Sequence, residues 1–222
     1  SVQSYLKRLG LAYRKVAPIP AKAKPEVQEQ FLAEELNPVL EEAKPGKRHG
    51  FFVDASDLVF AAFLGSLWGF TRIFLPTESR RQRYHVLGAF HAISHEGVTI
   101  TNTAYINSQS VVDLLTKLRA QFSELPMTLV LDNAAYQRCA SVRDKAAEFT
   151  IQLLFLPPYS PNLNLIERLE KFVKAQCLHS VYHETFAAFQ QAIDDCLTKT
   201  ATDYKPQLDT LLTLNFQHFK AS

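Results

Sequence analysis

The sequence predicts an α/β protein in which helices cover a mixed β-sheet, and three observations indicate this fold class. Apolar runs of strand length end abruptly, as at Asp132 after Met127–Leu131 and at Pro157 after Ile151–Leu156. Strand patterns come first along the chain and then alternate with helical patterns, which is the order of a mixed sheet covered by helices. Hydrophobic residues make up 47 % of 222 residues and only 7 are glycine, so a sizeable core is expected.

The N-terminal region is predicted to form a helical arm. A short helix is expected over residues 1–9, where apolar residues share one face and Gly10 ends the helix. Residues 16–20 contain two prolines and read as a stiff linker. A second helix is expected over residues 25–42, because apolar side chains recur there at helical spacing.

Charge is distributed unevenly over this arm. Residues 1–24 carry six basic residues and no acid, whereas residues 25–43 carry six acids and no base. A basic end of this kind favours a polyanionic partner. Lys7 and Arg8 lie on the outer side of the first helix, either as solvated charges or facing DNA phosphates from the last helix of a truncated helix-turn-helix module.

The remaining chain is predicted to hold the sheet and its helices. The expected strands begin or lie at residues 51–54, 61–75, 83–93, 97–101, 127–132 and 151–156. The expected helices follow a cap at Ser108 and cover residues 140–149, 165–178, 186–200 and 206–219.

Composition excludes several protein classes. No apolar segment is long enough to span a membrane and no signal peptide is recognisable. The chain opens on Ser1 rather than methionine, which suggests a fragment or a processed product. Cys139, Cys177 and Cys196 are widely spaced and fit neither a disulfide framework nor a C-x-x-C zinc pattern, so a reducing cytosol is expected.

Three acidic residues stand where a rigid element can hold a charge. Asp54 follows the apolar run FFV, Asp132 ends another apolar run, and Glu167 lies in the first turn of an expected helix. Magnesium prefers oxygen ligands and takes one or two protein carboxylates, so three acids suffice for two ions about 4 Å apart. Turn chemistry or helix electrostatics explains single acids. The three together predict a shared metal site.

Two histidine pairs offer an alternative metal site. His91 and His95, and likewise His179 and His183, have the i,i+4 spacing that binds zinc on a helix. His91 falls in an expected strand, however, and neither pair has a third ligand arranged for it. Ser160 as a hydrolase nucleophile is excluded because no G-x-S-x-G motif surrounds it.

The segment LPPYSPNLNLIE ends at Glu167, and 34 residues separate this acid from Asp132. With Asp54, this pattern resembles the catalytic domain of bacterial insertion-sequence transposases of the mariner-like superfamily, insertion sequence 630 group. The resemblance covers about residues 44–200. The N-terminal SVQSYLKRLGLAYRK resembles the closing helix of that family's DNA-binding region.

The resemblance implies a ribonuclease-H-like α/β fold with a mixed five-stranded sheet flanked by helices and a short helical arm. Residues 1–43 would be the arm, a remnant of a helix-turn-helix region with its linker helix, and residues 44–222 the catalytic domain. The implied activity is DNA transposition: metal-dependent strand cleavage at transposon ends, then transfer of the freed 3′-hydroxyl into target DNA. Implied partners are double-stranded DNA, as terminal inverted repeats and a TA-containing target, and a second copy of the chain, in the cytoplasm at the nucleoid.

Within that resemblance we expect two Mg²⁺ or Mn²⁺ ions. Asp54 would bridge them, Asp132 and Glu167 would each complete one site, and Asn133 and Asn164 would hold the carboxylates or a phosphate. The candidate DNA-contacting residues are Lys7, Arg8, Arg14, Lys15, Arg80, Arg81, Arg83, Tyr159 and Ser160. A packed loop aromatic remains an alternative for Tyr159, and a solvated hairpin loop for the three later arginines.

The chain departs from the family pattern at three positions. Asp57 stands where histidine is frequent, Leu165 where proline is frequent, and Glu170 where an aromatic residue is usual. Asp57 is therefore a fourth carboxylate that could join or disturb metal binding. Two other functions are considered: a non-catalytic DNA-binding protein derived from a transposase, and a nuclease acting on RNA–DNA hybrids, which would lack the proline-rich segment.

Overall fold

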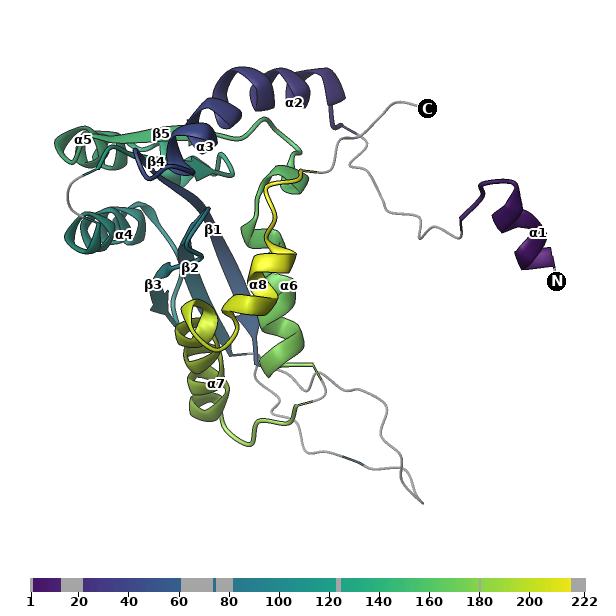
Figure 1. The fold of residues 1–222 in the computed structure, drawn as a ribbon. Helices are drawn as coiled ribbons and strands as arrows, with labels where there is room; N and C mark the ends of the chain where they lie inside the picture. Colours follow the sequence, from purple (N-terminus) through teal and green to yellow (C-terminus); the bar gives the residue numbers. More distant parts are fainter. Residues whose placement is uncertain are drawn as a thin grey trace.

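Five strands form one mixed sheet in the described part of the chain, as predicted (Figure 1). The computed structural model describes residues 2–12, 22–60, 74, 82–122, 125–179 and 181–216. The sheet order is β3-β2-β1-β4-β5, and its strands are β1 (His49–Val59), β2 (Arg83–His91), β3 (Gly97–Asn102), β4 (Met127–Leu131) and β5 (Ile151–Phe155). The predicted strand at 61–75 falls outside the described residues, apart from position 74.

The central strand β1 joins an antiparallel half of the sheet to a parallel half. It pairs antiparallel with β2 from Phe51, opposite His91, to Val59, opposite Arg83. It pairs in parallel with β4 only up to Val53, which lies opposite Leu131. β1 therefore continues past the point where its parallel neighbour stops.

Two helical layers cover the two faces of the sheet (Figure 1). Helices α4 (Ser108–Gln121) and α5 (Ala140–Glu148) pack on one face, and α6 (Ile166–Cys177), α7 (Phe186–Thr198) and α8 (Lys205–Leu211) on the other. The cap of α4 is Asn107 rather than the predicted Ser108, because the Asn107 side chain accepts a hydrogen bond from the backbone of Ser110. The last helix ends at Leu211, earlier than predicted.

Alternation along β1 divides its side chains between the two layers. Phe51 and Val53 lie in the core beneath α4 and α5. Phe52 lies on the opposite face with residues of α6 and α8. Because strand side chains alternate, Asp54 shares the face of Phe52 and points toward the layer that contains α6.

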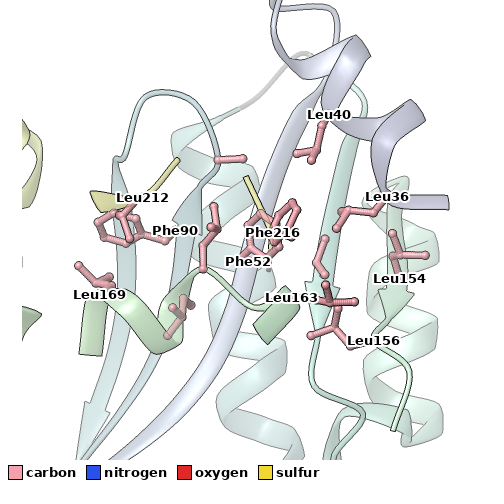
Figure 2. Packing of buried hydrophobic residues seen from close by; sticks show 14 of the residues in the cluster. Leu36, Leu40, Phe52, Phe90, Leu154, Leu156, Leu163, Leu169, Leu212 and Phe216 are labelled. Carbon is pink, nitrogen blue, oxygen red and sulfur yellow. The ribbon is translucent and has the colours of Figure 1, made fainter. Parts of the chain in front are cut away.

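The helical arm is nearly continuous over residues 25–43. It consists of α2 (Pro25–Phe31), a π-helical stretch (Leu32–Leu36) and α3 (Asn37–Ala43). Leu36 and Leu40 enter the same hydrophobic cluster as Leu154 and Leu163 (Figure 2). The helix over 25–43 is thus packed on the core next to the segment that leads into α6.

The short N-terminal helix α1 (Val2–Arg8) has no buried residue. Its end carries Lys7 and Arg8, both exposed, as predicted for a basic surface. Its expected cap, Ser1, lies outside the described residues. No helix in the described ranges has the length and apolar character needed to cross a membrane.

Candidate active site

Strand register places two of the predicted acids side by side. Val53 and Leu131 are partners on adjacent parallel strands, so the next residues, Asp54 and Asp132, leave this pairing together. Asp54 lies two residues after Phe52, and Asp132 lies two residues after Val130. Phe52 and Val130 pack in one hydrophobic cluster, and because side chains alternate along a strand, both acids point to the face of the sheet that carries this cluster. Asp132 stands at a strand end as predicted, whereas Asp54 lies inside β1, since the ladder with β2 runs on to Val59.

The third acid reaches the same face from α6. Glu167 is the second residue of this helix, and its neighbours Ile166 and Leu169 are buried against the sheet. The charges of Asp132 and Glu167 both act on Asp54. The structure therefore brings the three predicted acids into one neighbourhood, from β1, from the end of β4 and from the start of α6.

Asp54 lies in surroundings that disfavour its charge. Burial raises the pKa of Asp54 to about 7, against the effect of a hydrogen bond from the backbone of Ala55. Repulsion by Asp132, Glu167 and Glu170 contributes to this rise. A bound cation would remove this penalty, because it compensates the clustered negative charge.

Asn164 connects Asp54 to the helix that carries Glu167. The Asn164 side chain is 2 % exposed, and its Nδ2 donates to Asp54 Oδ2 at 3.3 Å and to the Val53 carbonyl at 3.4 Å. Its Oδ1 accepts from the backbone of Ile166 at 3.2 Å, at the start of α6. Asn164 thus lies where an orienting group for Asp54 was expected.

The backbone of the loop after Asp132 is fixed by hydrogen bonds to a buried side chain, Gln137, which the sequence pattern did not indicate. Gln137 is fully buried, and its Oε1 accepts hydrogen bonds from the backbones of Asn133 at 3.2 Å and Ala134 at 3.1 Å. Asn133 has a φ of 81°, which suits asparagine better than most residues. The contacts of Asn133 thus run to Gln137, and no hydrogen bond from its side chain to a described carboxylate is formed.

Tyr136 is a second residue without a sequence signal. It lies in the 3₁₀ turn Ala135–Arg138, directly after the Asp132 loop. Burial, together with the charges of Asp132 and Asp54, raises the pKa of Tyr136 to about 12. The phenol therefore remains protonated near the acids and can donate a hydrogen bond there.

The two unexpected acids, Asp57 and Glu170, both have protein partners. Asp57 forms a short contact with His85 Nδ1, and Arg83 Nη1 lies 3.8 Å from its other oxygen. Alternation puts Asp57 on the face of β1 opposite to Asp54. Glu170 shares the face of Asp54 and accepts hydrogen bonds from Ser56 and Lys174.

The predicted DNA-contacting residues lie in different surroundings. Tyr159 is 52 % exposed, with a φ of 59°, and Lys22 Nζ lies 5.6 Å from the centre of its ring. Ser160 is buried and accepts from Gln28 Nε2 at 2.9 Å, so its hydroxyl faces the protein instead of an outside partner. Four of the predicted residues lie outside the described ranges: Arg14, Lys15, Arg80 and Arg81.

The histidine pairs considered as zinc ligands have other partners. His91 contacts His49 at 3.2 Å, His95 contacts Asp209 at 2.9 Å, and His183 contacts the Cys177 carbonyl at 2.8 Å. Across the described ranges, no three His, Cys, Asp or Glu side chains stand close enough together to ligate one ion. Asp54, Asp132 and Glu167 are included in this statement: they lie in one neighbourhood, but their carboxylates are not close enough together to ligate one ion.

The donor chemistry of the three acids nevertheless fits a divalent cation. All three offer carboxylate oxygens, which hard cations such as Mg²⁺ prefer. Asp54 carries an unfavourable charge that such a cation would stabilise. The site therefore has the composition of a magnesium or manganese site.

A sequence model of the DDE superfamily endonucleases matches residues 65–190, more than half of the chain. The chain belongs to this superfamily. The match contains Asp132 and Glu167 and begins after Asp54. Among curated proteins, no match was found.

Solved structures of a mariner transposase share the fold. The Mos1 transposase paired-end complex with the left transposon end has a TM-score of 0.63 at 13 % identity, covering 99 % of this chain and 71 % of that chain. The catalytic domain of Mos1 mariner transposase has a TM-score of 0.57 at 12 % identity, covering 91 % and 100 %. This DDE superfamily member thus has the ribonuclease-H-like fold of transposase catalytic domains, as the resemblance implied.

Proposed function

We propose that this protein is a metal-dependent DNA transposase of the insertion sequence 630 group. It would cleave strands at transposon ends and transfer the freed 3′-hydroxyl into target DNA. The observation that carries the proposal is the partly buried Asp54 carboxylate beside Asp132 and Glu167, in a chain of the DDE superfamily. The family membership supports phosphodiester chemistry, and the donor set supports a divalent cation.

Asp54, Asp132 and Glu167 would hold two Mg²⁺ or Mn²⁺ ions. When bound, such ions activate the attacking hydroxyl and stabilise the leaving oxygen in phosphodiester cleavage. Asn164 fixes Asp54 through its 3.3 Å hydrogen bond. Gln137 holds the backbone that follows Asp132, so that these two carboxylates keep a fixed direction.

Double-stranded DNA is the proposed partner, in the form of terminal inverted repeats and a target containing TA. Mos1 structures in complex with a transposon end and with Mg or Mn support DNA and a divalent metal by analogy of fold. We assign residues 1–43 to a DNA-binding arm and residues 44–222 to the catalytic domain. The exposed candidates for contacts to the DNA backbone are Lys7, Arg8 and Tyr159. Because two ends must be joined, a dimer is expected to act.

The test is strand cleavage and strand transfer with duplexes that carry the inverted repeats flanking the coding sequence. With Mn²⁺ or Mg²⁺, the wild-type protein should cut and join, and Asp132→Asn should lower both rates by at least about 10³-fold, because a metal ligand is lost. Asp144→Asn, on α5, is the matched control, since this acid lies outside the candidate site. DNA binding without cleavage by the wild type would instead favour a non-catalytic protein derived from a transposase.

A further inference from the structure

Glu170 forms a polar contact between the two elements that carry Asp54 and Glu167. Its Oε1 accepts a hydrogen bond from Ser56 Oγ on β1 and another from Lys174 Nζ at 2.7 Å, one turn further along α6. Hydrogen bonds to an ionised carboxylate are stronger than those between neutral groups. The contact therefore ties α6 to β1.

The contact lies directly beside the candidate site. Ser56 is two residues after Asp54 and on the same face of β1. Glu170 is three residues after Glu167, which places both on one side of α6. Asp54, Ser56 and Glu170 line one pocket between the sheet and α6. A change in the Ser56–Glu170 contact would therefore alter the placement of Glu167 relative to Asp54.

Glu170 remains charged in a mainly apolar place. Burial alone would raise the pKa of Glu170, but the hydrogen bonds from Lys174 and Ser56 outweigh burial, and the pKa is lowered. The other residues around the pocket include Leu58, Val86 and Leu169. A carboxylate there is stable only with partners, and its charge adds to the repulsion on Asp54.

We infer that Glu170 is a positioning residue, which fixes α6 on β1 through Ser56 and so sets the direction of Glu167 toward Asp54. This inference rests on the proposed function, because it assigns the contact a role in the same reaction. Glu170 acts through its hydrogen bonds to Ser56 and Lys174, and not as a further metal ligand. It has this role at a position where the family usually has an aromatic residue.

The test is a double-mutant cycle between Ser56 and Glu170. Glu170→Ala and Ser56→Ala should each lower kcat for strand cleavage about 10-fold or more, with KM for DNA within about 2-fold, and the double variant should lose no more than the stronger single variant. Glu170→Gln keeps an oxygen that accepts from Ser56, and it should retain kcat within about 3-fold. Additive losses, or a Glu170→Gln variant as defective as Glu170→Ala, would overturn the inference.

Two further measurements separate the possible failures. Mn²⁺ affinity by titration calorimetry should fall less than about 3-fold in Glu170→Gln, whereas a 10-fold fall would make Glu170 a ligand and contradict the positioning role.

Thermal unfolding without metal should show coupling between Ser56→Ala and Glu170→Ala, and the absence of coupling would show that the contact is not formed. This last readout needs no transposase activity, so a failure of the proposed function would be recognised separately. Glu148→Ala, which removes an exposed ion pair with Lys145 on α5, is the matched control and should change none of these values.

Discussion

At the scale of single residues, Asp54 is the acid of the candidate site whose charge most affects the stability of the metal-free protein. Its side chain lies between the sheet and α6 and is surrounded by other acids, so that burial and repulsion raise its pKa to about 7. Above that pH the metal-free folded protein carries a charge that the unfolded chain would place in water. The cluster of acids thus suits a positively charged ligand, and it lowers the free energy of unfolding of the metal-free protein.

Asp54→Asn should therefore stabilise the metal-free protein. The folded-state pKa is raised above the unfolded value of 3.8, so the carboxylate reduces stability increasingly as pH rises from about 4 to about 7. At pH 8 with EDTA, the variant should unfold a few degrees higher than the wild type, which corresponds to about 1–2 kcal/mol. The difference should vanish near pH 3.5.

Added Mg²⁺ or Mn²⁺ gives the complementary measurement by calorimetry. Millimolar metal should raise the unfolding temperature of the wild type and leave that of Asp54→Asn nearly unchanged. Equal metal-induced shifts in both proteins would contradict the assignment of Asp54 as a ligand.

At the scale of elements, one buried amide joins α2 to the loop before α6. Gln28 on α2 is 3 % exposed; its Nε2 donates to Ser160 Oγ at 2.9 Å, and its Oε1 accepts from Asn162 Nδ2 at 3.0 Å. The loop that these bonds hold also contains Tyr159, whose φ is positive, and Leu163, which is fully buried. The position of Glu167 therefore depends on a helix more than 130 residues earlier in the chain.

Gln28→Ala should loosen this junction. The change leaves two polar side chains of the loop, at Ser160 and Asn162, without their amide partner, which costs about 1–3 kcal/mol of unfolding free energy. Chemical denaturation of both proteins measures this cost. Gln30→Ala is the control, since Gln30 lies on the exposed side of α2 and its side chain donates to Glu34; a change below about 0.5 kcal/mol is expected. Similar losses in the two variants would mean that the junction is not a source of stability.

At the scale of the whole molecule, a second group of polar residues lies where β1 begins and β2 ends. His91 Nδ1 accepts from the backbones of Ile93 and Ser94, so its Nε2 carries the proton and donates to His49 at 3.2 Å. The His91 ring also stacks with Phe122. Burial, together with the neighbouring His49 and His95, lowers the pKa of His91 to about 4.

The contribution of His91 to stability should consequently fall in mild acid, opposite in sign to that of Asp54. The unfolded chain binds a proton at His91 near pH 6.5, whereas the folded protein resists protonation until about pH 4. The contribution of His91 is present above pH 6.5 and is lost as pH falls to about 4, by about 2 kcal/mol after allowance for solvent screening. Urea unfolding of wild type and His91→Gln across this window measures it, because Gln keeps an acceptor and a donor without titrating. Parallel pH profiles for the two proteins would show that His91 does not contribute.

Most of the fold could be predicted from the sequence because it depends on local patterns. The apolar runs that end at Asp132 and Pro157 correspond to β4 and β5, and the helical pattern after Leu165 corresponds to α6. Local patterns did not predict the length of β1, which depends on how this strand pairs with its neighbours. Asp54 was expected on a strand that begins with the run FFV, but the pattern did not show how far this strand extends; β1 continues to Val59 because β2 supplies hydrogen bonds beyond the reach of β4.

The sequence by itself determined the family and the order of strands and helices, and it predicted the three candidate acids, because residue type and spacing carry this information. Only the tertiary structure decided which side chains surround those acids. Ser56 and Glu170, or Gln28 and Ser160, meet across more than 100 residues, and strand register together with helix packing creates such contacts. The pKa of Asp54 is likewise a tertiary property, since burial and the charges of neighbours from other elements set it.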